Sequence, residues 1–162
     1  MPRKPASEYL RVTEVIGFVN SEWFKWWVKS VGYEECERIG KESAAFGTGV
    51  HSIVEGYLLN KDHIEVTERQ KFCGNLMIQW IAQAKAKPIT LDGKPAVECD
   101  LVSEKYKLKG HPDAVVTFNE TGVPWLLDWK TSKSMKPDYK LQLAAYAMMI
   151  EEMYGIKVND AA

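Results

Sequence analysis

The chain has 162 residues, of which 46% are hydrophobic and 27% are charged, a composition that fits one globular domain over residues 1–162. Its formal net charge of -1 argues against a broad cationic surface for nucleic acid. No apolar run is long enough to cross a bilayer, and the N-terminal stretch MPRKPASEYL lacks the apolar core of a secretion signal. We therefore expect a cytoplasmic protein that does not enter a membrane.

The three cysteines, Cys36, Cys73 and Cys99, are odd in number, far apart and not in CxxC spacing. This arrangement disfavours a disulfide framework, a structural zinc site and a cysteine-ligated iron-sulfur cluster. A reducing compartment is the simplest interpretation.

The first half of the chain has a helical pattern. Residues 11–32 carry apolar residues at helical spacing and predict one or two helices that end at Gly32. A turn at FGTG is expected to lead into a helix over residues 50–59, and a further helix is expected over 67–85, before Pro88. The apolar face of that last helix is predicted to comprise Phe72, Leu76, Ile78, Trp80, Ile81 and Ala84.

The second half changes to turns and strands, then returns to helix. A turn at LDGK precedes predicted strands over residues 96–102, 105–119 and 123–132. A helix is expected from Pro137 to Tyr154 with Gly155 as its stop, and the IKV that follows can add at most a short strand. The predicted fold class is α/β (α+β), a small mixed sheet with an antiparallel meander flanked by helices.

The last two strands predict a hairpin whose ends carry charge. A turn over residues 119–122 (NETG) pairs residues whose numbers sum to 241, so Asp113 faces Asp128. Opposed Cβ atoms lie about 4.5 to 5.5 Å apart, and like charges so placed are destabilising unless one protonates or a cation lies between them. Two hard oxygen ligands suit Mg²⁺ or Mn²⁺.

The same register orders the neighbouring residues. Alternation places Lys130 on the face of Asp128 and turns Trp129 to the opposite face, toward a helix, while His111 lies opposite Lys130. The alternative is a solvated sheet face with a surface ion pair. Matched positions on two strands favour the metal site.

Two predicted helices carry polar pairs four residues apart. His51 and Glu55 share one helix face after the bend at Gly47 and Gly49. Glu55 either orients His51 or is a structural carboxylate, and His51 alone could be a partly buried polar residue.

Gln142 and Tyr146 likewise share a face, although the helix could be an ordinary amphipathic one. The loop TSKSMK before it, which includes Lys133, suits phosphate contact. A further aromatic cluster could either stack unpaired bases or belong to the core. It comprises Trp23, Phe24, Trp26 and Trp27.

These motifs resemble a known family in order and spacing. Pro112-Asp113 followed by Asp128-Trp129-Lys130 is similar to the PD-(D/E)XK nuclease superfamily, which has a restriction-endonuclease-like core. GTGVHSIVEGYL (47–58) resembles GTxxHxxxE, and QLAAY (142–146) resembles QxxxY, both typical of its RecB-like exonuclease branch. That branch includes RecB-type nuclease domains, CRISPR-associated adaptation nucleases and mitochondrial genome maintenance exonucleases.

The resemblance implies roles for individual residues. His51, Asp113, Asp128 and the backbone carbonyl of Trp129 would bind Mg²⁺ or Mn²⁺, and Asp113, Asp128 and Lys130 would be catalytic. Gln142 and Tyr146 would contact nucleic acid or steady the lysine, and the cationic loop adds Lys133 as a candidate nucleic-acid contact. Glu55 and Glu98 are secondary candidates. The cysteines that hold an iron-sulfur cluster in some members have no counterpart, so no cluster is expected.

The function so implied is a metal-dependent DNA exonuclease in recombination, replication or repair. Its substrate would be DNA with a single-stranded portion, in a bacterial or phage-infected cell. One alternative is a catalytically silent nuclease-like fold that binds nucleic acid or a partner. Another is a structural domain that a metal ion stabilises.

Overall fold

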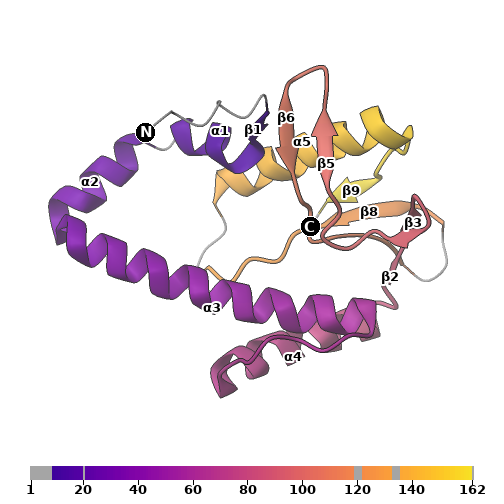
Figure 1. The fold of residues 1–162 in the computed structure, drawn as a ribbon, viewed down its shortest axis with the longest axis horizontal. Coiled ribbons are helices and arrows are strands. Elements are labelled where there is room, and N and C mark those ends of the chain that lie inside the picture. Colours follow the sequence, from indigo (N-terminus) through magenta and orange to yellow (C-terminus); the bar gives the residue numbers. More distant parts are fainter. Residues whose placement is uncertain (1–8, 20, 119–121, 133–135, 162) are drawn as a thin grey trace, which may run out of the picture.

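The computed structural model describes residues 9–19, 21–118, 122–132 and 136–161, without the side chains of Phe18, Val19, Ser21 and Trp23. The helices of the described residues are α1 (Val12–Val19), α2 (Ser21–Val31), α3 (Tyr33–Leu59), α4 (Glu68–Gln83) and α5 (Pro137–Tyr154). Figure 1 shows α2 leading away from α1 into α3, which runs back beneath the strands beside α4. The predicted break at Gly32 (φ 91°) and the predicted last helix, with its stop at Gly155 (φ 66°), are confirmed.

Helix α3 is much longer than predicted. We expected a helix that followed a glycine turn, but residues 47–49 lie inside α3, which begins at Tyr33. Its first half is lined by exposed ion pairs at helical spacing, such as Arg38 with Glu35 and Glu42. Apolar periodicity could not reveal this segment, because charge pairs accompany it instead of a buried stripe.

The glycine at position 49 serves close packing, not a turn. A Cβ added there would overlap the side chain of Gln70. The Gln70 amide donates to two backbone carbonyls of α3, at 3.0 and 3.2 Å, and Gln70 also forms the capping box of α4 with Thr67. Gly49 therefore lets the start of α4 dock against α3 half a turn before His51.

The strands of the described residues form small sheets. Their bounds are β1 (Leu10–Arg11), β2 (Lys87–Pro88), β3 (Thr90–Leu91), β4 (Lys94–Pro95), β5 (Leu101–Ser103), β6 (Leu108–Gly110), β7 (Ala114–Thr117), β8 (Pro124–Leu127) and β9 (Asp160–Ala161). One sheet has the order β2-β7-β8-β9, another β1-β6-β5, and β3 and β4 form a hairpin around the turn predicted at LDGK. Parallel and antiparallel pairs occur together, so the mixed sheet with flanking helices is confirmed.

The predicted register of the hairpin is confirmed. β7 pairs with β8 antiparallel, with Ala114 opposite Leu127 and Thr117 opposite Pro124. Each pair sums to 241, so the next position outward places Asp113 and Asp128 opposite each other, just past the ends of both strands. Residues 119–121 of the expected turn lie outside the described residues.

The predicted strands are shorter than expected. Residues 96–102 join the sheet through a single bridge at Val97 before β5 begins, and Glu98 has a left-handed φ of 48°. Residues 105–119 divide into β6 and β7, and the strand expected over 123–132 ends at Leu127. The last short strand is β9, not IKV. The chain leaves regular structure next to Glu98, Asp113 and Asp128, the residues predicted for the site.

The β2-β7-β8-β9 sheet separates two layers of core, one toward α1 and α5 and one toward α3 and α4 (Figure 1). The first layer includes Val12, Val115, Leu126, Met149 and Ile150. The second includes Val54, Ile81, Ala114, Val116 and Leu127. Because side chains alternate along a strand, Asp113 and Asp128 lie on the α5 side and Trp129 on the α4 side.

The apolar face predicted for α4 is only partly buried. Ile81 is buried, whereas Phe72, Leu76 and Trp80 are exposed. Contact with α3 runs through Gly74, where an added Cβ would meet Ile53 at 2.7 Å, so the large side chains are left outside the contact. None of the helices in the described part of the chain is long and apolar enough to span a membrane.

Candidate metal centre

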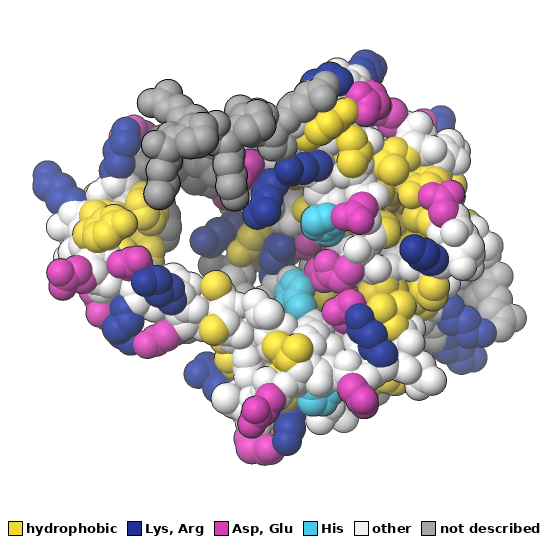
Figure 2. Space-filling model, in the orientation of Figure 1, with side chains coloured by type: hydrophobic (Ala, Val, Ile, Leu, Met, Phe, Trp, Pro, Cys, Tyr) yellow, Lys and Arg dark blue, Asp and Glu magenta, His cyan; other side chains and the backbone are white. Residues whose placement is uncertain are grey.

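Most of the predicted site residues meet in one cavity of about 570 Å³ at the ends of β7 and β8. Its walls come from the start of α1, the middle of α3, the segments around β6 and β8, and α5. The predicted residues that line it are His51, Glu98, His111, Asp113, Asp128, Lys130, Gln142 and Tyr146. Figure 2 shows this face hollowed near its centre, with histidine, acidic and basic side chains around the hollow.

Three side chains form a group that could hold a metal ion. One nitrogen of His51 and one oxygen each of Glu98 and Asp113 all lie within 4.8 Å of one another. His51 Nδ1 is 3.0 Å from Asp113 Oδ1. Two carboxylates and an imidazole are a donor set that Mn²⁺ accepts readily and that Mg²⁺ accepts through the oxygens. The observed geometry therefore fits a hard divalent cation.

The electrostatics of this group favour a cation. Burial of the carboxyl and the charge of Asp113 raise the pKa of Glu98 to about 7, although much of the Glu98 side chain remains in contact with solvent. Burial alone would lower the pKa of His51, but the hydrogen bond and charge of Asp113 outweigh it and raise that pKa. A divalent cation among these groups would favour their deprotonated, metal-binding forms.

Asp128 and Lys130 form the wall next to the three-residue group. Only 5% of the Asp128 side chain is exposed, and its Oδ2 pairs with Lys130 Nζ. Burial and the charge of Asp113 raise the pKa of Asp128 against the lowering effect of Lys130. Asp113 and Asp128 thus repel each other, as their opposed positions predict.

The two strand ends are tied together by a backbone contact. The backbone N–H of Trp129 donates to Asp113 Oδ2. The Trp129 side chain turns to the opposite face, as predicted, and its ring centroid lies 6.1 Å from that of Trp80 on α4. Asp113 is therefore held from both sides, by His51 and by the chain beyond β8.

Gln142 and Tyr146 line the cavity from α5. Gln142 Nε2 donates to Asp128 Oδ1 (3.1 Å) and to the Tyr146 hydroxyl (3.2 Å). Both side chains are buried, and the Tyr146 ring packs so closely on Gly110 that a Cβ at that position would overlap it. The structure joins Gln142 to Asp128. The motif by itself left open whether Gln142 contacts nucleic acid or supports Lys130.

Several predicted residues take other partners or lie elsewhere. Glu55 pairs with Lys61 at 2.6 Å, which corresponds to the structural alternative and not to an orienting contact with His51. His111 lines the cavity, but its Nε2 is 2.6 Å from Asp100 Oδ1. Lys133 lies outside the described residues.

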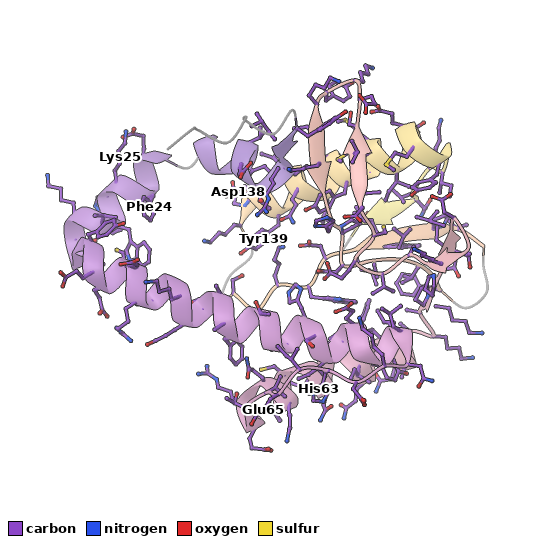
Figure 3. All side chains as sticks on the ribbon, viewed as in Figure 1. Phe24, Lys25, His63, Glu65, Asp138 and Tyr139 are labelled. Atoms are coloured by element: carbon purple, nitrogen blue, oxygen red, sulfur yellow. The ribbon has the colours of Figure 1, made fainter. Side chains whose placement is uncertain are left out.

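The aromatic cluster of α2 does not form a core. Phe24 is 49% exposed and Trp26 is 64% exposed, and Trp27 is half-buried with an edge contact to Phe24. Figure 3 places Phe24 and Lys25 on α2, away from the strands. The side chain of Trp23 is outside the described part of the chain.

The sequence interpretation missed two cationic residues of the cavity wall, Arg11 and Lys109. They are register partners in the parallel pair of β1 and β6. No local signal could have found them, because β1 has only two residues and pairs with a strand almost a hundred positions away.

Comparison with known proteins places this geometry in a family. The family model of the PD-(D/E)XK nuclease superfamily matches residues 24–161. A search of curated proteins gives no match. The matched span includes every predicted site residue and the group of His51, Glu98 and Asp113. The chain therefore belongs to the PD-(D/E)XK nuclease superfamily, whose members are metal-dependent nucleases that act on nucleic acid.

Proposed function

We propose that this nuclease is a DNA exonuclease of the RecB-like branch that uses Mg²⁺ or Mn²⁺, and that residues 1–162 form one nuclease domain. The observation that carries the proposal is the single cavity in which His51, Glu98, Asp113, Asp128 and Lys130 converge from separate elements. A mixed set of carboxylates, an imidazole and one ammonium matches what hydrolysis of a phosphodiester requires.

In this proposal Asp113, Asp128, His51 and the backbone carbonyl of Trp129 hold the cation, and Glu98 joins them because its carboxyl reaches the same space. When bound, the cation supplies Lewis acidity and offsets the negative charge that develops on the phosphate. Burial and, after it, repulsion from Asp113 raise the pKa values of Glu98 and Asp128, and a bound cation would offset both effects by stabilising the charged carboxylates.

Hydrolysis forms a bond between a water oxygen and phosphorus and breaks one P–O ester bond, while a proton leaves the water and another reaches the leaving oxygen. Lys130 is the chain's own cation at this point. Its side chain is 23% exposed and its ammonium pairs with Asp128, so it can contact a phosphate oxygen without leaving the carboxylate. It would orient the water and stabilise charge on the phosphate.

Gln142 and Tyr146 act as positioning residues in this proposal. Their exposed fractions of 9% and 3% leave little surface for a nucleic-acid strand. The hydrogen bond from Gln142 to Asp128 instead fixes one carboxylate oxygen, and Tyr146 supports the amide from below. Their spacing on α5 is the observation that favours the RecB-like branch.

DNA with a single-stranded portion is the proposed substrate. Arg11, Lys109 and His111 line the cavity beside the carboxylates and suit the phosphates that flank the cleaved bond. The exposed rings of Phe24 and Trp26 on α2 are available to stack unpaired bases. The proposed setting for such an activity is recombination, replication or repair in the cytoplasm of a bacterial or phage-infected cell.

The test is cleavage of end-labelled DNA. The protein is incubated with linear single- and double-stranded DNA, circular DNA and RNA, each with Mg²⁺, Mn²⁺ or EDTA. We expect linear DNA to be shortened from an end only with metal, and circular DNA and RNA to stay intact. Asp128→Asn and Lys130→Met should abolish cleavage.

Matched controls are Asp62→Asn and Lys157→Met, which change exposed residues outside the cavity and should keep full activity. Cleavage that persists in both site variants would overturn the assigned residues. Binding of DNA without any cleavage by the unaltered protein would instead indicate a silent member of the family. Cutting of circular DNA would replace the exonuclease assignment by an endonuclease.

A further inference from the structure

A second cavity, of about 290 Å³, adjoins the metal centre on the far side of Asp128 and Lys130. These two residues line both cavities. Apart from them, the second cavity is lined by aromatic and aliphatic side chains, namely Met77, Trp80, Leu127, Trp129, Tyr139 and Leu143. In the view of Figure 3, Tyr139 lies at the start of α5, on the side toward α3.

The aromatic walls of this cavity, which we call the aromatic pocket, are held in place by their neighbours. Trp80 and Trp129 meet edge to face with ring centroids 6.1 Å apart. The Tyr139 hydroxyl donates to Ser132 Oγ at 2.9 Å, and Lys130 Nζ lies 5.1 Å from the Tyr139 ring centroid. Trp80 is 44% exposed, so the pocket can be reached from solvent.

We propose that the aromatic pocket takes the unpaired base of the nucleotide next to the cleaved phosphate, an inference that rests on the proposed nuclease function. A phosphate placed on Lys130 has the carboxylates on one side and the aromatic pocket on the other, because Asp128 and Lys130 form the shared wall. A nucleotide has the same division, with an anionic phosphate attached to a flat apolar ring system. The substrate group and the two cavities therefore match in polarity and in order.

The lining also defines what kind of base recognition is possible. Among the described lining residues, polar side-chain groups come only from Asp128, Lys130, the two indoles and the Tyr139 hydroxyl, which already has a partner. Stacking on aromatic faces accepts every base. Entry requires that the base leave its stack and its pair, which costs least at a single-stranded or frayed end. The pocket thus favours unpaired ends without selecting a sequence.

The binding test requires no cleavage. Single-stranded oligonucleotides with 2-aminopurine at the 5′ or the 3′ end are titrated with protein in EDTA, and fluorescence reports stacking of the modified base. We expect quenching for one of the two ends. Trp80→Ala and Tyr139→Ala should remove it and weaken binding about tenfold, whereas Tyr139→Phe, which keeps the ring, should retain it.

Two exposed aromatic residues provide matched controls, Phe72→Ala on the same helix as Trp80 and Tyr33→Ala for Tyr139. Both should keep the quenching. Circular dichroism and thermal melting of every variant separate loss of the pocket from loss of the fold. Equal quenching in the folded Tyr139→Ala variant and the unaltered protein would overturn the proposal, as would the absence of quenching at either end.

The cleavage test separates this inference from the function on which it rests. Single-stranded DNA carrying an abasic residue at the terminal position is compared with intact DNA in Mn²⁺. The unaltered protein should cleave the abasic substrate about tenfold more slowly, and Tyr139→Ala should cleave the two at nearly equal rates. Equal rates for the unaltered protein would reject the aromatic pocket and leave the nuclease function standing. No cleavage of either substrate would reject the proposed function, and the fluorescence result would still decide whether the pocket binds a base.

Discussion

The two sides of the metal centre differ in how firmly they are held. On the strand side, Asp113 and Asp128 are almost fully buried, and each has at least two partners, including the Trp129 backbone and Gln142. On the other side, Glu98 is exposed, its backbone has a left-handed φ, and it lies outside any strand. We therefore expect the strand side to set the position of a bound ion and the Glu98 side chain to adjust to it.

The largest expected effect comes from removing a charge on the strand side. Asp113→Asn keeps an oxygen that can accept from the Trp129 N–H but removes a carboxylate from the centre of the group. We expect cleavage to fall about 10³-fold and stabilisation by Mn²⁺ to disappear from thermal melts. Asp62→Asn is the control, and a variant that still gains stability from Mn²⁺ would contradict the ligand assignment.

A smaller effect is expected from disturbing the residues that support the strand side. Gly110→Ala would place a methyl group where the Tyr146 ring lies. Gln142 would then lose its hydrogen bond to Tyr146, and Asp128 would lose its fixed orientation. We expect kcat/KM to fall about 10- to 100-fold and stability to fall by about 1 to 3 kcal/mol.

The control for this substitution is Gly40→Ala, an exposed helix position with no atom within 4 Å of an added Cβ. It should be neutral or slightly stabilising, because alanine favours a helix more than glycine does. Full activity of Gly110→Ala would show that Tyr146 need not be held in place.

The Glu98 side should contribute less to metal binding than the strand side. Glu98→Gln leaves His51, Asp113 and Asp128 in place, so calorimetric titration with Mn²⁺ should show about tenfold weaker binding. Glu65→Gln, at an exposed position outside the cavity, should bind Mn²⁺ as the unaltered protein does. A loss as large as that of Asp113→Asn would show that the two sides are equally important.

The same variant tests the pH dependence of the metal-free protein. The folded-state pKa of Glu98 is raised from 4.5 to about 7, so its contribution to stability is complete below pH 4.5 and is lost as the pH rises through 7. The raised pKa values of Asp128 and His51 act in the same direction. Urea titrations in EDTA between pH 5 and 8 should show a loss that is about 1 kcal/mol smaller in Glu98→Gln, because solvent screens this exposed carboxylate. An unchanged slope would contradict the raised pKa.

The smallest effect is expected at the cationic residues of the cavity wall, Arg11 and Lys109. Arg11→Gln should weaken binding of single-stranded DNA a few fold and reduce the slope of log Kd against log salt by roughly 1. Arg69→Gln, which removes an arginine outside the cavity, should leave that slope unchanged. An unchanged slope in Arg11→Gln would show that Arg11 does not contact the phosphates of the bound DNA.

Prediction from the sequence succeeded where neighbours along the chain decide the geometry. The β7–β8 register follows from one short turn and from strict alternation, so the pairing of Asp113 with Asp128 could be predicted from residue numbers alone. The helix stops at Gly32 and Gly155 likewise depend on local backbone conformation. The prediction of a glycine turn before His51 was wrong. Gly49 is needed for its close contact with Gln70, which lies twenty-one positions away in the chain.

The sequence by itself predicted most residues of the candidate metal centre: two facing carboxylates, a lysine on the same face, a helical histidine and the Gln142–Tyr146 pair. Turn chemistry and alternation predict the carboxylates and the lysine, whereas the histidine and the glutamine–tyrosine pair were expected from the resemblance to the family, because their helical spacing alone also fits an ordinary helix. Only the tertiary structure decided that Glu98 turns into the group, that Arg11 and Lys109 complete the wall, and that an aromatic pocket adjoins Lys130. Packing between distant segments selects these contacts, and a single sequence contains no local signal for them.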